Sequence, residues 1–550
     1  MLRAVALAAG VCLAGCAGMQ SAEAPGSRAY ADFLIGRVAN ARADHEAAAD
    51  RYFAALARAP GDQALIEGAL SASLASGDIE RARRAARMAG HADAPGFAHI
   101  VRAADALVDQ RYAQADVELS RVEGAAAEEL LARMLAVWAA AGRGESGDIA
   151  ADLAPLASIR PYGALFSYQQ AMVLDFAGRQ DEALAAYNTA AQGGLWLPSG
   201  VGRHADLLVR MGRRDEALAL LNTETNAANP GLAAARARIE AGESAAMDRL
   251  TPATGAATAL YGMSALFRQE HDPSNSLSAL TLALMLDPNF DGARLALAQQ
   301  QADLGNVALA RRVLAGIAAG SPYAQSGRIL DAWIVHDSGD VETAISLARA
   351  TAQTGDARAR RALADMYRGA ERYAEAEPLY TELIAEQPQD WRLHFSRGAA
   401  RERLGRWPEA EADFQRALQL SPEQPDVLNY LGYTWVDRGE RLQEGLAMIR
   451  RAAELRPMSG AIIDSLGWAY YRLGDYPQAL EWLEAAVRLE PADPTLNDHL
   501  GDVYWRVGRR IEARFQWQRA LTLDPDNPEI IRLKLEHGLV DEPAPQSATR

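Results

Sequence analysis

Cysteine is almost absent from this 550-residue chain, in which Cys12 and Cys16 are the only two. A structural zinc site needs four ligands, usually from Cys pairs backed by further Cys or His, and here no second pair exists. The Cys-x3-Cys spacing also differs from the Cys-x-x-Cys of thiol redox sites, and no βαβ pattern surrounds it. The two cysteines therefore argue against a metal centre, a redox centre and a disulfide framework.

Lysine is scarcer still, since Lys534 is the only one among 56 Lys and Arg residues. The chain therefore has no Gly-Lys-Ser/Thr and no P-loop for nucleotide phosphates, and Schiff-base or Ser-Lys catalysis has almost no candidates. Its nine histidines form no HExxH or other ligand spacing, and no Gly-x-Ser-x-Gly elbow occurs. We therefore expect no enzyme, no metal, no cofactor and no small-molecule substrate.

The net charge and the lack of long apolar stretches limit what the protein is expected to bind. The formal net charge is −16, and an acidic surface repels phosphate backbones, so we expect no nucleic acid partner. No stretch reaches the eighteen or more consecutive apolar residues of a membrane-spanning helix. Any association with a membrane is therefore expected to depend on an anchor.

The first sixteen residues have the composition of a secretory signal. Arg3 provides a short basic region, Ala4 to Leu13 form an apolar run, and small residues then lead to Cys16. This order predicts a signal peptide over residues 1–15. A plain signal peptide followed by an incidental cysteine is the alternative.

The sequence Leu13-Ala14-Gly15-Cys16 resembles the lipobox of bacterial lipoproteins. The resemblance implies cleavage before Cys16 and acylation of that residue, so that lipid anchors the chain without a spanning helix. Residues 16–28, which are small and polar, are expected to be a flexible tether. Ala17 stands where an Asp would retain a lipoprotein in the inner membrane. The same resemblance therefore implies the outer membrane of a Gram-negative cell, facing the periplasm.

A period of 34 residues runs through the C-terminal part of the chain. Small residues, mid-repeat alanines and bulky residues keep the same phase relative to five prolines, which are separated by 34, 35, 34 and 34 residues. The prolines are Pro388, Pro422, Pro457, Pro491 and Pro525; the small residues are Ala364, Gly398, Gly432, Gly467 and Gly501; the bulky residues are Tyr380, Phe414, Ile449, Leu483 and Trp517. The pattern matches the tetratricopeptide repeat (TPR), which has two antiparallel helices per repeat.

We therefore predict an all-α TPR α-solenoid, a superhelix of antiparallel helix pairs. Strand-type alternation is not convincing anywhere in the chain. The repeats match well over residues 355–535, remain in phase over 259–354, and are degenerate over 29–221. Between the last two ranges, 222–258 is rich in Asn, Thr, Gly and Ala and is expected to be an irregular joint. Residues 536–550 are expected to be a disordered tail.

In a TPR, fixed positions of the first helix of each repeat line the inner groove. In the last three complete repeats these positions contain four aromatic rings interleaved with acids and an amide, which suits an extended or helical peptide. The predicted groove residues are Asn429, Tyr433, Asp464, Trp468, Tyr471, Asp498, Asp502 and Trp505. Such a groove favours apolar or basic segments. The alternative is that some of these rings pack between adjacent helices.

Residues 388–521, with "IIDSLGWAYYRLGDYPQALEWLEAAV" at their centre, look like the C-terminal repeats of large Gram-negative TPR lipoproteins of the LbcA type. The resemblance implies an adaptor that tethers a periplasmic carboxy-terminal processing protease and presents cell-wall hydrolases to it. By the same resemblance, the N-terminal half carries much of the partner binding. The alternative function is a passive scaffold in envelope assembly, such as secretion, pilus or outer-membrane biogenesis.

Overall fold

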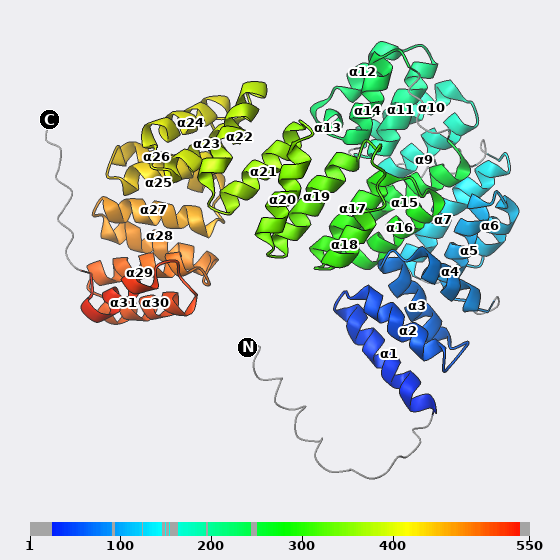
Figure 1. Ribbon diagram of the computed structural model, residues 1–550, viewed down its shortest axis with the longest axis horizontal. Coiled ribbons are helices and arrows are strands. Elements are labelled where there is room, and N and C mark those ends of the chain that lie inside the picture. The colour runs from blue at the N-terminus through cyan, green and yellow to red at the C-terminus, as the bar shows by residue number, and fades with distance from the viewer. Residues whose placement is uncertain are drawn as a thin grey trace, which may run out of the picture. The chain divides into compact units, whose positions relative to one another are not determined.

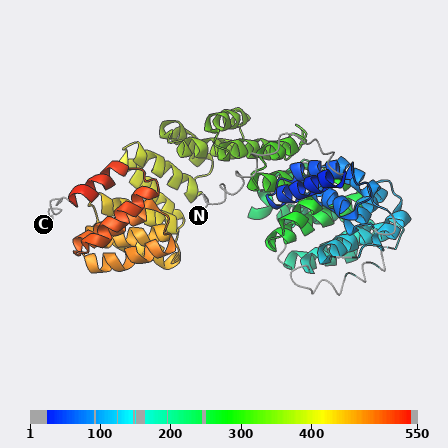
Figure 2. The same cartoon turned by 90° about the horizontal axis from the view of Figure 1, so that it is seen from below.

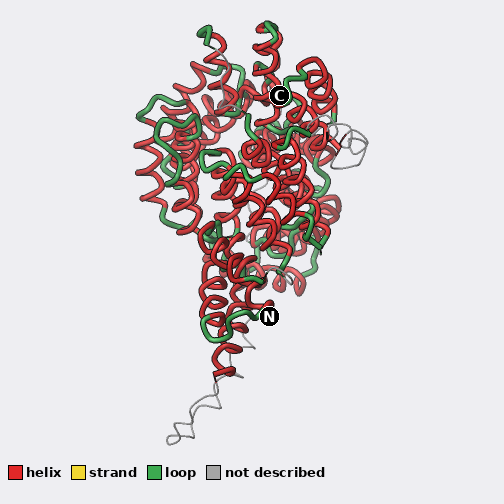
Figure 3. The backbone as a smooth tube through the Cα atoms, turned by 90° about the vertical axis from the view of Figure 1, so that its right-hand side faces the viewer, coloured by secondary structure: helices red, strands yellow, loops and turns green. Residues whose placement is uncertain are grey.

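The computed structural model describes residues 25–90, 94–123, 125–145, 149, 153, 163–193, 196–243 and 250–539. Within these ranges the chain forms helices and short connections and no strand (Figure 3). None of the helices found there is both long and apolar enough to cross a membrane. The predicted signal peptide, Cys16, most of the tether and residues 540–550 lie outside the described ranges.

The chain divides into two compact units, residues 1–347 and 348–550 (Figure 1). The helices that begin in the first unit are α1 (Pro25–Ala41), α2 (His45–Leu56), α3 (Gln63–Ala75), α4 (Ile79–Met88), α5 (Gly96–Val108), α6 (Tyr112–Leu119), α7 (Ala126–Gly142), α9 (Gly163–Phe176), α10 (Gln180–Gln192), α11 (Pro198–Arg210), α12 (Arg214–Leu221), α13 (Glu224–Ala227), α14 (Pro230–Glu240), α15 (Pro252–Gln269), α16 (Pro273–Leu286), α17 (Asp291–Asp303), α18 (Val307–Leu314), α19 (Ala324–Asp337) and α20 (Val341–Ala352).

The second unit consists of five helix pairs and one further helix. The pairs are α21 (Ala357–Gly369) with α22 (Tyr373–Glu386), α23 (Trp391–Arg403) with α24 (Trp407–Leu420), α25 (Pro425–Asp437) with α26 (Leu442–Leu455), α27 (Gly460–Arg472) with α28 (Tyr476–Leu489), and α29 (Pro494–Arg506) with α30 (Arg510–Thr522). The last helix is α31 (Pro528–His537). The members of each pair pack against each other, as predicted for TPR hairpins (Figure 2).

The small and bulky residues of the period pack against each other within these pairs. The five bulky residues of the period, from Tyr380 to Trp517, are all fully buried. Each of the four period glycines lies directly against the partner helix. A methyl group at Gly501 would lie 2.5 Å from the Trp517 ring, and one at Gly467 would lie 2.6 Å from Leu483. The absence of a side chain thus allows two helices to approach closely around a large residue.

The helix ends also follow the period. The second helix of the first four pairs ends two residues before its proline, as α28 does at Leu489 before Pro491. Proline has no amide hydrogen and clashes with the preceding turn, so it stops these helices. Between the two helices of a pair the chain reverses through a left-handed residue, such as Gly474 at φ 79° and Gly508 at φ 87°. Glycine adopts this conformation without strain.

The first unit contains contacts that the repeat pattern does not predict. Helix α16 packs against α3 and α5. The Thr281 hydroxyl donates to the carbonyl of Leu74 at 2.7 Å, and the Gln301 amide donates to that of Ala75 at 2.6 Å. Repeats of a simple solenoid contact only their neighbours. Here the chain folds back after some 200 residues and closes one continuous apolar core from Ala48 to Leu297.

Three predicted segments differ in detail from the structure. Residues 222–258, expected to be an irregular joint, contain α13, α14 and the first turns of α15, and the boundary between compact units lies at 347/348 instead. Thr251 explains the start of α15, because it forms a capping box with Thr254 before Pro252. Helix α1 begins at Pro25, so the last tether residues are helical, and α31 continues to His537, inside the predicted tail.

Candidate functional site

The predicted groove residues lie on α25, α27 and α29, the first helices of the last three pairs. These helices pack side by side, α25 against α27 and α27 against α29, and α31 then packs on α30. The fold therefore places the eight residues on adjacent helices, as the repeat register predicts. Their individual surroundings differ, and these differences determine which of them remain available to a partner.

Aromatic rings and one acid join α27 to α29. The Trp468 ring stacks on Tyr471 at a centroid distance of 4.7 Å and on His499 at 4.1 Å. Nδ1 of His499 lies 3.0 and 2.8 Å from the carboxylate oxygens of the buried Asp464. Burial lowers the pKa of His499, but the charge and hydrogen bond of Asp464 outweigh this and leave the pKa raised. His499 is therefore a buried, charge-paired bridge between two repeats.

Asp498 and Asp502 are paired with the only lysine of the chain. Nζ of Lys534, on α31, lies 2.9 and 2.8 Å from the two carboxylate oxygens of Asp498 and 2.9 Å from Asp502. Asp502 also accepts a hydrogen bond from Nε1 of Trp517 at 2.9 Å. Burial raises the pKa of Asp502 to about 6, against the opposing effect of Lys534. The predicted acidity of the groove is thus compensated within the protein at this end.

The Trp505 ring also has contacts within the protein. It packs on Trp517 with a centroid distance of 5.3 Å, and the Arg510 guanidinium lies 3.8 Å from its ring centroid. A methyl group at Gly538, directly after α31, would collide with the ring at 1.8 Å. Trp505 therefore packs beneath the chain that follows the last helix. This arrangement corresponds to the alternative in which a groove ring serves packing.

Asn429, Tyr433, Trp468 and Tyr471 are half-buried on α25 and α27, and Asp498 and Trp505 are half-buried on α29. Oδ1 of Asn429 and Nε1 of Trp468 are shielded from water and have no hydrogen-bond partner among the described residues. Burial, followed by the charges of Asp437 and Asp464, raises the pKa of Tyr433, so its hydroxyl is protonated at neutral pH. The four residues on α25 and α27 present aromatic surface, with one hydrogen-bond acceptor, Oδ1 of Asn429, and one donor, Nε1 of Trp468, that have no partner within the described part of the protein.

The arginines near this surface already have partners. Arg472 pairs with Asp437 at 3.0 Å, and Nε of Arg506 donates to the Tyr471 hydroxyl at 3.2 Å. The structure assigns both side chains to contacts between neighbouring first helices.

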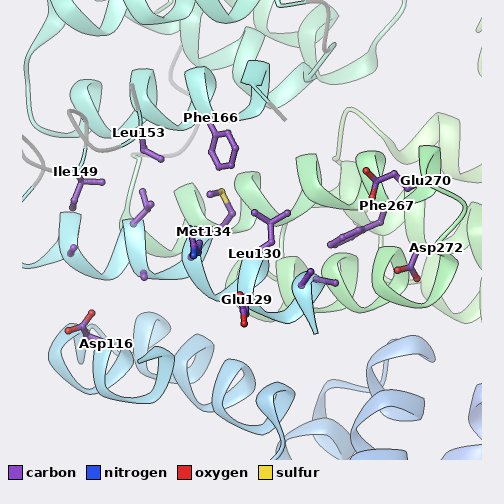
Figure 4. Close-up of a pocket in the computed structure, with 16 residues that line it drawn as sticks. Asp116, Glu129, Leu130, Met134, Ile149, Leu153, Phe166, Phe267, Glu270 and Asp272 are labelled. Carbon is purple, nitrogen blue, oxygen red and sulfur yellow. The ribbon is translucent and has the colours of Figure 1, made fainter. Parts of the chain in front are cut away.

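A second concave feature lies in the first unit. A pocket of about 780 Å³ is bounded by α7, α9, α15 and residues Ile149 and Leu153 of the connection between α7 and α9. In Figure 4, Phe166 projects from α9 toward Met134 and Leu130 of α7. Four carboxylates, Asp116, Glu129, Glu270 and Asp272, also line the pocket, and Arg133 is the only cation among the lining residues. Such a lining suits an apolar side chain and disfavours an anion.

Metal chemistry finds no support in the described part of the chain. No group of three or more His, Cys, Asp or Glu side chains there comes close enough to hold an ion. The acids Asp498 and Asp502 are bonded to Lys534, and Asp464 is bonded to His499; these contacts stabilise the packing of α27, α29 and α31.

Sequence reasoning missed two residues that determine the character of this surface. Lys534 stood out as the only lysine, but it lies beyond the last period proline, where the repeat register stops. His499 was visible inside a first helix, one position after a predicted groove acid. Residues one repeat apart lie on neighbouring first helices, so the spacing of 35 residues between Asp464 and His499 is the signal that could have paired them.

Comparison with known proteins agrees with the repeat pattern. A tetratricopeptide repeat family model matches residues 332–390 and 361–425, and a TPR repeat model matches 467–508. The "TPR repeat-containing protein PA4667" of Pseudomonas aeruginosa is 33% identical over 100 residues, which are 18% of this chain and 17% of that protein. This chain thus covers about one sixth of the length of that relative.

Solved structures to which this chain is similar include a tetratricopeptide repeat protein from Parabacteroides merdae. It is 16% identical with a TM-score of 0.39, covering 44% of this chain and 97% of its own. The Cut9–Hcn1 hetero-tetramer structure of APC/C contains another, 16% identical with a TM-score of 0.40 over 94% of this chain and 97% of its own.

The family models match the part of the chain in which the period, the buried bulky residues and the helix pairs coincide. TPR arrays present extended concave surfaces, and the matched repeats support a protein-interaction scaffold. The chain contains tetratricopeptide repeats, and its fold is an all-α TPR solenoid.

Proposed function

We propose that this protein is a lipid-anchored periplasmic adaptor that holds an envelope enzyme and protein substrates of that enzyme on its TPR surfaces. A carboxy-terminal processing protease is the proposed enzyme, and cell-wall hydrolases are the proposed substrates. The anchor is the acylated Cys16, and the proposed location is the periplasmic face of the outer membrane. The family resemblance of residues 388–521 and the lipobox-like sequence support this assignment.

The unpartnered polar atoms on α25 and α27 are the observation that carries the binding role. A buried polar atom without a partner costs about 1–3 kcal/mol, so such atoms call for an explanation. An extended peptide would provide an N–H for Oδ1 of Asn429 and a carbonyl for Nε1 of Trp468. The rings of Tyr433, Trp468 and Tyr471 would cover its apolar side chains.

The charge pairing within the protein indicates which kind of peptide segment this surface would bind. Because His499 compensates Asp464 and Lys534 compensates Asp498 and Asp502, these acids do not attract a basic segment strongly. We therefore favour a neutral or apolar segment over the basic one that composition alone suggests. Trp505 is not part of this proposed contact.

Crosslinked capture followed by enzyme assay tests the adaptor role. The chain from Ala17 onward, immobilised through a tag, is exposed to envelope extract beside Trp468→Phe and Asn429→Ala variants. Trp468→Phe keeps a ring against Tyr471 and His499 but removes the donor. Trp482→Phe on α28 is the matched control, since its Nε1 is likewise shielded and unpartnered but belongs to a second helix.

The captured enzyme is then purified and assayed with each variant. An adaptor raises turnover of the substrate, and the groove variants lower this effect while Trp482→Phe does not. If the captured proteins are assembly-machine subunits and no enzyme is stimulated, the passive scaffold is the better description. Mass spectrometry of the N-terminal peptide, with Cys16→Ala as control, tests the anchor separately.

A further inference from the structure

The first helix exposes an unpartnered apolar face. On α1, Tyr30, Leu34, Ile35 and Val38 are 62%, 42%, 48% and 52% exposed. At 100° per residue these four side chains occupy an arc of about 140° on one side of the helix. The opposite side packs against α2 and α3 (Figure 1). On that side Ala29 is buried and Gly36 lies against Tyr52. Single exposed apolar residues are ordinary, but four on one helix face form a patch.

The exposed charges that border this face are positive. The net charge of the protein is −16, yet the exposed charged residues of α1 are arginines, Arg28 and Arg37, and Arg42 follows its last turn. Asp32 is the only acid of the helix, and it is buried beneath, bonded to Arg51 at 3.3 Å and Arg58 at 2.5 Å. The apolar face is therefore bordered by cations and free of carboxylates.

We infer that this face of α1 lies on a bilayer surface that contains anionic lipid headgroups. An apolar helix face with flanking arginines is the arrangement of helices that lie in the plane of a membrane interface. A protein partner with a purely apolar patch would not account for the flanking arginines. An anionic bilayer accounts for both the apolar residues and the arginines.

This inference adds a second membrane contact to the proposed lipid anchor. It rests on the proposed anchor only in that an acylated Cys16 would keep α1 near the membrane. Cys16 precedes Pro25 by nine residues, so an acylated Cys16 would hold α1 within about 30 Å of the bilayer. Contact through Tyr30, Leu34 and Val38 would then orient the first unit on the membrane. A lipid tether alone would leave that unit free to turn.

Vesicle sedimentation tests the inference without the lipid. The chain from Ala17 onward keeps every described residue and lacks Cys16, so the result does not depend on acylation. It is mixed with vesicles of phosphatidylglycerol and phosphatidylethanolamine, or of phosphatidylcholine alone. We expect binding to the anionic vesicles that weakens with salt. Leu34→Ser with Val38→Ser should lower the partition coefficient at least about tenfold, and Arg37→Gln should lower it about fivefold.

A matched control uses another exposed apolar pair. Ile511 and Phe515 on α30 are 83% and 66% exposed, and Ile511→Ser with Phe515→Ser should leave vesicle binding unchanged. Melting curves by circular dichroism establish that each variant is folded. Absence of binding by the parent chain, or binding that the α1 variants do not change, overturns the inference. So does a dimer that the α1 variants dissociate while vesicles bind nothing, because the face would then join two copies. None of these results bears on acylation of Cys16, which is measured separately.

Discussion

Nδ1 of His499 lies within 3.0 Å of both carboxylate oxygens of Asp464, across the boundary between two repeats. The two residues are 35 positions apart in sequence and both are buried. A buried, paired charge is stabilising only while both partners keep their ionisation state. The stability of the second unit is therefore expected to depend on pH in a direction that these groups determine.

We predict that the second unit becomes less stable as pH rises through the pKa of His499. The folded-state pKa lies above the ordinary 6.5, so the stabilising contribution is complete below about 6.5 and is lost at higher pH. The pKa of Asp502, about 6, also lies above its ordinary value, so the folded state binds that proton more tightly than the unfolded state does. The contribution of this group to stability is therefore also lost as pH rises toward 6. Lys534 and Asp498 face the same cluster.

Urea unfolding at a series of pH values measures this dependence. The variant His499→Gln should flatten the slope above pH 6.5, whereas His537→Gln, at an exposed position on α31, should leave it unchanged. An identical pH profile in the wild type and His499→Gln would contradict the prediction.

Replacement of Lys534 should destabilise the second unit strongly. Lys534→Met keeps the length of the side chain but leaves Asp498 and Asp502 unpaired, and the loss of one partner from a buried pair costs about 3–5 kcal/mol. Chemical denaturation followed by tryptophan fluorescence gives the free energy of unfolding. Adding Asp498→Asn and Asp502→Asn should restore part of the loss, since no uncompensated charge remains. If Lys534→Met alone is as stable as the parent, the cluster contributes little.

A methyl group at Gly501 should disturb the last helix pair. Its Cβ would lie 2.5 Å from the Trp517 ring, so Gly501→Ala forces α29 and α30 apart at a cost of about 1–3 kcal/mol. Gly320→Ala is the comparison, because a Cβ there meets nothing within 4 Å. Thermal unfolding of both variants should show a lower midpoint for Gly501→Ala alone. A second variant, Gly501→Ala with Trp517→Leu, should recover part of the loss by relieving the contact.

The fold-back of the first unit can be tested at one hydroxyl. Thr281→Val keeps the shape of the side chain but removes the donor to the buried Leu74 carbonyl, at an expected cost of about 1–3 kcal/mol. Thr258→Val is a close control, since the Thr258 hydroxyl donates to Thr254 within its own helix. Hydrogen exchange should show faster opening around Leu74 and Ala75 in Thr281→Val. Equal exchange in the two variants would mean that the contact does not stabilise the closed core.

The sequence predicted the structure best at positions where a single local contact determines the residue type. The proline period, the close-packing glycines and the bulky residues from Tyr380 to Trp517 predicted the helix pairs of the second unit correctly. These positions depend on local contacts between two adjacent helices. Because the same contact recurs in every repeat, the residues that make it recur at the same spacing in the sequence.

The same register could not predict contacts between residues at unrelated spacings. Thr281 with Leu74 joins positions some 200 residues apart, and nothing in either local pattern marks the pairing. Lys534 reaches Asp498 and Asp502 from a helix beyond the last repeat. The groove residues were placed on the correct helices, but their availability depends on these non-repeating contacts. Whether Asn429, Tyr433, Trp468 and Tyr471 bind a peptide stays a prediction.

The closure of the first unit also determines how that unit can fold. The contacts of Thr281 and Gln301 with the end of α3 join distant parts of the chain, so they raise the contact order of this unit above that of hairpins that contact only their neighbours. Contacts of this kind form slowly, because a long loop must close first. The surfaces of α3 and α5 that α16 covers therefore stay exposed until α16 has packed onto them. The second unit folds through neighbouring hairpins and has no such delay.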